Sequence, residues 1–62
     1  MILTLDLATL KTAGFTTREG FAIRKVTRNL SADDQYAFIA DRLDTTGDSR
    51  FAAVLSAMVV TL

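Results

Sequence analysis

The sequence contains no cysteine, no histidine and no proline. Without cysteine the chain forms no disulfide, and without cysteine and histidine it lacks the usual ligands of zinc and haem. No proline-rich linker, low-complexity tract or internal repeat separates two regions. We therefore expect residues 1–62 to form a single domain that holds no metal and no other cofactor.

Groups that support catalysis are scarce as well. The chain has no Gly-rich phosphate loop and no serine in an activated context, so the usual nucleophiles and bases are missing or unsupported. Asp34 and Asp41 share one side of a predicted helix, but two turns separate them, which is too far for one ion without other ligands. We expect a protein that is not an enzyme, with no catalytic residue, no cofactor-binding residue and no small-molecule substrate.

Long hydrophobic runs are absent. The longest stretch without a charge is Phe51 to Leu62, which is shorter than the about 20 residues that a membrane-spanning helix needs. No basic segment precedes an apolar stretch at the N-terminus, as it would in a secretory signal. We expect a chain that does not enter a membrane and that acts in the cytoplasm or within a soluble assembly.

An excess of one charge is also missing, because 7 basic residues balance 7 acidic ones. The two signs are nevertheless separated along the chain. Residues 1–30 hold five cations and two carboxylates, whereas residues 31–62 hold five aspartates and two arginines. This asymmetry favours attraction between copies or to a partner more than general affinity for nucleic acid.

Half of the residues are apolar, which indicates a folded chain. A chain of this length removes only about 60% of its surface from water on folding, so its stability depends on well-packed helices or on association. The pattern predicts an all-α fold of three to four short helices in a small bundle, completed by another chain.

Capping residues indicate where the helices begin. Asp6 starts a short helix that Gly14 ends, Thr16 and Glu19 form a capping box, and Ser31 caps a third helix. The turn at 44–48 leads to the last helix, with Asp48 or Thr46 as its cap. Residues 1–5 also fit an extended segment, but no other part of the chain offers an obvious strand partner.

The last helix is expected to run from Phe51 to Leu62 and to be buried on two sides. Its apolar face carries six residues at helical spacing: Phe51, Val54, Leu55, Met58, Val59 and Leu62. The opposite face is small and nearly uncharged, with Ala53, Ser56, Ala57 and Val60. A helix without a solvated face is usually buried all round, so we predict that a second chain covers the side that this chain does not.

The second predicted helix separates an apolar stripe from a basic face. The stripe consists of Ala22, Ile23, Val26 and Leu30. Phe21 lies on the opposite side among four cations, Arg18, Arg24, Lys25 and Arg28. Three interpretations remain open: a solvated cationic face whose arginine stems cover Phe21, a protein contact, or a nucleic-acid surface with cations for phosphates and an aromatic ring for stacking.

The third predicted helix shows a similar division. Its inner face carries Ala32, Tyr36, Ile39, Ala40 and Leu43. Phe38 is expected on the outer side, with Asp34, Gln35, Asp41 and Arg42. An exposed ring beside carboxylates complements the ring among cations at Phe21, and we predict that both serve as secondary contacts.

Four short motifs lie within residues 15–43: FTTRE at 15–19, AIRKV at 22–26, LS at 30–31 and IADRL at 39–43. This half of the chain resembles the LuxR-type helix-turn-helix DNA-binding domain, which favours an LTPRE-like start. The interval between LS and IADRL is longer than in that family, and the apolar stretch 51–62 replaces the recognition helix, which must carry polar side chains to the bases. We assign no DNA-contacting residue from this resemblance.

The function that these patterns favour is a non-enzymatic helical protein–protein interaction or assembly subunit, self-associating or part of a larger complex. The alternative is a small helix-turn-helix-like DNA- or RNA-binding regulator that uses Arg18, Arg24, Lys25 and Arg28. A third possibility is an inhibitor that docks its apolar helix into a groove of another protein.

Overall fold

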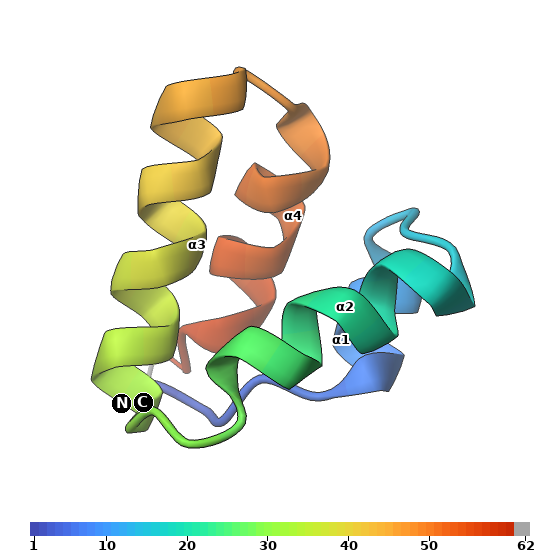
Figure 1. The fold of residues 1–62 in the computed structure, drawn as a ribbon. Helices are drawn as coiled ribbons and strands as arrows, with labels where there is room; N and C mark the ends of the chain where they lie inside the picture. Colours follow the sequence, from blue (N-terminus) through green and yellow to red (C-terminus); the bar gives the residue numbers. More distant parts are fainter. Residues whose placement is uncertain (61–62) are drawn as a thin grey trace.

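A computed structural model describes residues 1–60 of the chain. These residues form four helices: α1 (Leu7–Thr12), α2 (Thr17–Thr27), α3 (Ala32–Thr46) and α4 (Ser49–Met58). Figure 1 shows α3 and α4 side by side, with α1 and α2 crossing next to them. The prediction of a small all-α bundle of three to four short helices is confirmed.

Each helix begins at a side chain that accepts a hydrogen bond from a free backbone amide. The four caps are Asp6, Thr16, Ser31 and Asp48. At α2 the capping box is complete, because Thr16 Oγ1 accepts from the Glu19 amide at 3.1 Å and Glu19 Oε1 accepts from the Thr16 amide at 3.0 Å. The starts of all four helices therefore follow from local chemistry that the sequence shows.

The helices α3 and α4 form the main packed layer. Gly47 ends α3 with a left-handed φ of 69°, a conformation that glycine adopts without strain, and the chain then reverses into α4. The buried side chains of this pair are Ile39 from α3 and Phe51, Val54 and Met58 from α4. Leu5, Leu10 and Phe15 complete the core from the N-terminal part of the chain.

The two chain ends pair with each other, which corrects two expectations. Residues 1–5 are extended, and Ile2 forms an antiparallel bridge with Val59. The Leu3 amide donates to the Met58 carbonyl at 2.8 Å, and the Val60 amide donates to the Met1 carbonyl at 2.9 Å. The helix expected to reach Leu62 ends at Met58, because β-branched Val59 and Val60 supply the strand partner that the first residues need. Leu62 lies outside the described residues.

Helix α2 turns a different side to the core from the one predicted. Its buried residues are Gly20 and Thr27, with Ile23 partly buried between them. Ala22, Val26 and Leu30 of the predicted stripe are exposed. The buried side is therefore rotated by roughly a fifth of a turn from the apolar stripe. A small residue at position 20 decides this orientation, since it lets α1 approach α2 closely.

Helix α3 also differs from its predicted faces at two positions. Phe38 is half-buried and packs against the core, and Gln35 is buried, so neither lies on the outer side. Ile39 is fully buried, and Tyr36 and Leu43 pack partly against the core as predicted. Because α3 is enclosed by α4 on one side and by the N-terminal segment on another, its inner face is wider than a single apolar stripe.

Candidate interaction surface on helix α2

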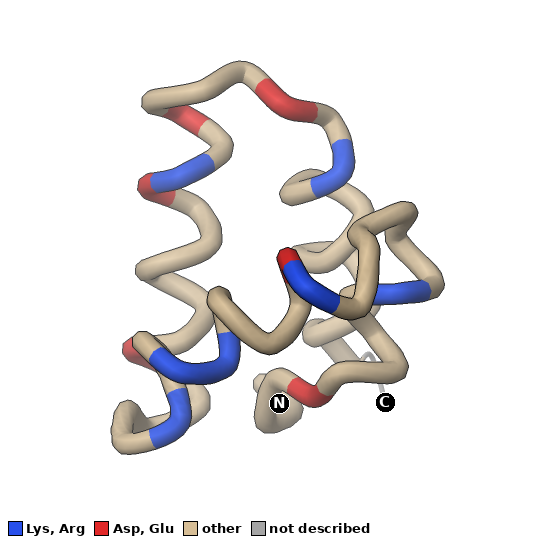
Figure 2. Tube along the Cα trace, turned by 45° about the vertical axis from the view of Figure 1, so that its right-hand side comes forward, with Lys and Arg blue, Asp and Glu red and all other residues tan. Residues whose placement is uncertain are grey.

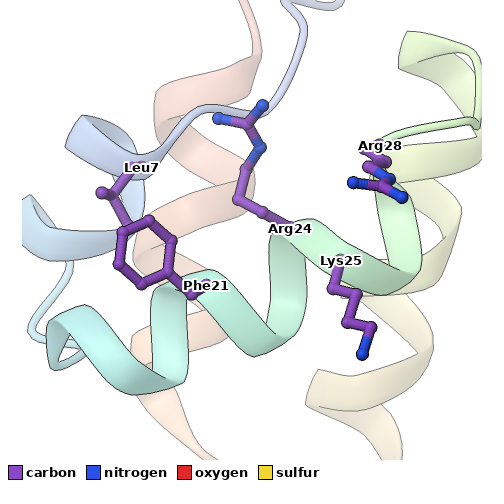
Figure 3. Close-up of a pocket in the computed structure, with 5 residues that line it drawn as sticks. All are labelled: Leu7, Phe21, Arg24, Lys25 and Arg28. Carbon is purple, nitrogen blue, oxygen red and sulfur yellow. The ribbon is translucent and has the colours of Figure 1, made fainter.

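An open groove runs along the exposed side of α2 beside α1. It has a volume of about 430 Å³, and its lining residues are Leu7, Phe21, Arg24, Lys25 and Arg28. We call it the α2 groove. Phe21 is 60% exposed, and Figure 3 shows its ring next to Leu7, with the three cations further along the helix. The outward position predicted for Phe21 is confirmed.

The α2 groove results from the helical spacing of its lining residues on α2 and from the missing side chain at Gly20. Arg24, Lys25 and Arg28 follow Phe21 at i+3, i+4 and i+7, so all four project from one side of the helix. A Cβ atom on Gly20 would lie 2.5 Å from the Leu7 Cδ1 atom. Because position 20 has no side chain, Leu7 reaches the surface of α2 and forms the apolar end of the groove.

The cations of the α2 groove have no carboxylate partner among the described residues. The two salt bridges of residues 1–60 both belong to Arg50, which contacts Glu19 at 3.2 Å and Asp48 at 2.7 Å. The pKa of Asp6 lies below its usual range, chiefly because its carboxylate accepts from the Thr9 amide, and the charge of Arg24 adds a smaller lowering. The groove therefore presents cations that form no ion pair within the described residues, beside an exposed aromatic ring.

The predicted nucleic-acid residues divide into two groups. Arg24, Lys25 and Arg28 line the α2 groove, whereas Arg18 does not. Figure 2 shows the basic positions of α2 along that helix and several of the carboxylates on α3 and on the turn into α4. The structure thus brings three of the four cations together with Phe21.

Carboxylates cover the outer side of α3. Its exposed acidic residues are Asp33, Asp34, Asp41 and Asp44, and they surround the exposed Ala37. No group of three potential metal-ligating side chains occurs within residues 1–60. Phe38 is half-buried against the core, so the predicted match between two exposed phenylalanines is wrong on the α3 side.

The residues predicted for an interface on the last helix occupy three kinds of position. Phe51, Val54 and Met58 lie in the core of this chain. Leu55 packs partly against the core, and Val59 is 42% exposed beside the N-terminal segment. The other side of α4 consists of small exposed residues, Ala52, Ala53, Ser56 and Ala57.

Sequence reasoning missed two polar side chains that connect different elements of the fold. The first is Gln35, which at 2% exposure accepts from the Leu5 amide at 2.8 Å and donates to the Thr27 carbonyl at 3.0 Å. It therefore joins the N-terminal segment, α2 and α3. A signal was present, because Gln35 lies one turn before Ile39 and shares its side of α3.

Arg50 is the second missed residue. Its guanidinium donates hydrogen bonds to the Asp48 carboxylate and to Glu19 at the start of α2. The guanidinium carbon also lies 4.3 Å from the centre of the Phe15 ring. The hydrogen bond from Arg50 lowers the pKa of Asp48, and the Thr16 amide, assisted by Arg50, lowers the pKa of Glu19. Arg50 therefore connects α4 to α2. Its contacts with Glu19 and Phe15 are distant in the sequence, so local patterns do not predict them.

Comparison of the chain with protein-family models, with curated proteins and with solved structures finds no match in any of the three. No helix within residues 1–60 has both the length and the apolar character needed to cross a membrane.

Proposed function

We propose that the protein is a non-enzymatic interaction subunit that binds another protein through the exposed side of α2. The observation that carries this proposal is Phe21, a large aromatic side chain that is 60% exposed and lines an open groove. Large apolar groups exposed beside charged ones are typical of protein-binding surfaces. The lack of histidine and cysteine in the sequence supports a role other than catalysis.

Other features of α2 support the same role. Val26 is 59% exposed, and Leu30, just after the helix, is 38% exposed. The buried residues of α2 are Gly20, which faces Leu7 of α1, and Thr27, whose carbonyl accepts from Gln35 of α3. A helix that exposes two of its three large apolar side chains, Phe21 and Val26 but not Ile23, is arranged for contact with a further molecule.

The experiment compares the wild-type protein with Phe21→Ser. Sedimentation velocity over a wide concentration range measures self-association, and chemical cross-linking in the native cells followed by affinity purification measures binding to other proteins. We expect the wild type to form a homo-oligomer or a defined complex that the variant loses. A monomer at every concentration, with no cross-linked protein that depends on Phe21, would refute the proposal.

A second candidate function is binding of DNA or RNA. The observation that favours it is the position of Arg24, Lys25 and Arg28 along α2 from the exposed Phe21 ring, since cations and a stacking platform are the two components of single-strand binding sites. Phosphate binding weakens steeply as salt concentration rises, whereas burial of apolar surface is maintained or strengthened. A titration with an oligonucleotide at several salt concentrations separates the two functions.

A further inference from the structure

We propose that the α2 groove binds an acidic amphipathic segment of another protein. The segment places a large apolar side chain against Phe21 and Leu7, and its carboxylates lie against Arg24, Lys25 and Arg28. This inference rests on the proposed function and specifies the chemistry of the partner.

Phe21 and Leu7 form the apolar end of the α2 groove. The Phe21 ring is 60% exposed, and Leu7 is only partly buried, so together they form an apolar surface that nothing within residues 1–60 covers. Figure 3 shows the two side chains next to each other at one end of the groove. A leucine or phenylalanine from a partner would remove both from water, which is the main source of affinity in small interfaces.

The rest of the groove lining is positively charged. Three cations and no carboxylate line the groove, and the two salt bridges of the described residues lie elsewhere, at Arg50. Carboxylates that accept from arginine form stronger hydrogen bonds than neutral groups, and complementary charge raises the rate of association. A partner with an apolar side chain followed by acidic residues fits this order of groups.

A second copy of this chain fits the groove less well. The acidic face of α3 carries Asp33, Asp34, Asp41 and Asp44, but Ala37 is the apolar residue among them. Phe38 is half-buried and packs partly against the core of its own chain. The centre of the acidic α3 face therefore lacks a large apolar side chain, which favours a different chain over a second copy of this one.

A nucleic acid also fits less well. A duplex carries one phosphate charge per about 1.7 Å of its axis, so a bound polyanion extends well beyond three cations. The chain has a formal net charge of zero, and four exposed aspartates lie on α3. A short acidic peptide matches the limited extent of the positive groove better than a continuous phosphate backbone does.

The test uses a synthetic fluorescent peptide of glutamate residues with two leucines one helical turn apart. Three matched probes accompany it: a version with alanine for both leucines, a version with lysine for every glutamate, and a single-stranded oligonucleotide of the same formal charge. Fluorescence anisotropy with the full chain measures each affinity. We expect the acidic leucine peptide to bind, and each of the other three probes to bind about tenfold more weakly or worse.

Matched protein variants locate the binding site. Phe21→Ser is expected to weaken binding of the acidic leucine peptide about tenfold, whereas Val26→Ser removes an apolar side chain of similar exposure on another side of α2 and leaves the affinity unchanged. Arg28→Glu weakens binding, and Arg18→Glu, outside the groove, serves as its control. Circular dichroism checks that all four variants remain folded.

Three results would overturn the inference. The first is tighter binding of the oligonucleotide than of the acidic leucine peptide. The second is a lysine or alanine peptide that binds as well as the acidic leucine peptide. The third is an equal loss of affinity in Phe21→Ser and Val26→Ser. If none of the probes binds while the wild type still forms an oligomer or a cross-linked complex that requires Phe21, an acidic amphipathic partner is ruled out and the proposed interaction function stands.

Discussion

The α3–α4 pair and helix α2 use their apolar residues in opposite ways. Ile39, Phe51, Val54 and Met58 of the pair are at most 9% exposed. Helix α2 exposes Phe21 and Val26 and buries Gly20 and Thr27. Hydrophobic stabilisation scales with the apolar area removed from water, so the large apolar side chains of the pair stabilise the fold, whereas α2 retains surface that is available for binding.

The two regions also differ in the sign of their charge. Helix α2 and its C-cap Arg28 together carry four cations and Glu19, whereas α3 carries four exposed aspartates and Arg42. Gln35 and the Arg50–Glu19 contact connect them through polar groups. The molecule thus combines the α3–α4 pair, whose α3 is acidic, with the basic helix α2. Helix α2 is joined to the pair mainly through α1 and a few hydrogen bonds.

Paired aspartate substitutions give the largest expected contrast between the regions. Leu55→Asp with Met58→Asp is expected to abolish folding, because burying a charge costs several kcal/mol and small domains of this length have only about 3–9 kcal/mol of stability. Phe21→Asp with Val26→Asp is expected to change the free energy of unfolding by less than about 1 kcal/mol, because both side chains are already exposed. Far-UV circular dichroism measures the helicity of both double variants, and urea titration measures their free energy of unfolding. Retained helicity in Leu55→Asp with Met58→Asp would contradict the assigned role of the α3–α4 pair.

Gln35→Leu tests the connection between the regions. The substitution leaves the buried Leu5 amide without an acceptor, whereas the Thr27 carbonyl still accepts from the Leu30 amide. We expect a loss of about 1–3 kcal/mol in the free energy of unfolding, together with faster hydrogen exchange at the Leu5 amide. Thr45→Leu, on the exposed side of the same helix, is the control and should change stability by less than about 0.5 kcal/mol. Equal stability of the two variants would show that Gln35 does not join the regions.

Acid tests the two carboxylates at the starts of α2 and α4 that both contact Arg50. The folded chain lowers the pKa of Glu19 and Asp48, so the stability that these carboxylates contribute is complete above about pH 5 and is lost as the pH falls through their folded pKa values. We expect the midpoint of urea unfolding to be constant from neutral pH to about pH 5 and to fall below about pH 4. Glu19→Gln should reduce this dependence. A midpoint that rises or stays constant in acid would refute the interpretation.

Gly20→Ala has the smallest expected effect. Alanine favours the helix by about 0.5–1 kcal/mol over glycine, but its Cβ atom would force Leu7 to move, which costs on the order of 0.5–1.5 kcal/mol. We expect a net change within about 0.5 kcal/mol and a clear shift of the Leu7 methyl NMR signals. Ala22→Gly, on the exposed side of the same helix, measures the propensity alone and should cost about 1 kcal/mol. A full gain of helix stability in Gly20→Ala, with Leu7 unmoved, would mean that close approach of α1 does not require glycine.

The sequence by itself determined where the helices begin. Each cap uses a side chain and an amide within three residues of each other, as at Asp6 and at the Thr16–Glu19 box, so the information is local. It also determined the outward position of Phe21. The apolar faces were predicted well for α4, where Phe51, Val54 and Met58 share one side and are buried together.

Only the tertiary structure decided which side of α2 faces inward, where the last helix ends and what Phe38 contacts. The α2 orientation depends on Leu7 meeting Gly20, the end of α4 depends on Ile2 pairing with Val59, and Gln35 is buried because Leu5 and Thr27 need its amide. In each case the deciding atoms are distant in the sequence, and an apolar pattern along one helix carries no information about the segment that packs against it. The groove on α2 arises for the same reason, because α1 contributes its apolar end.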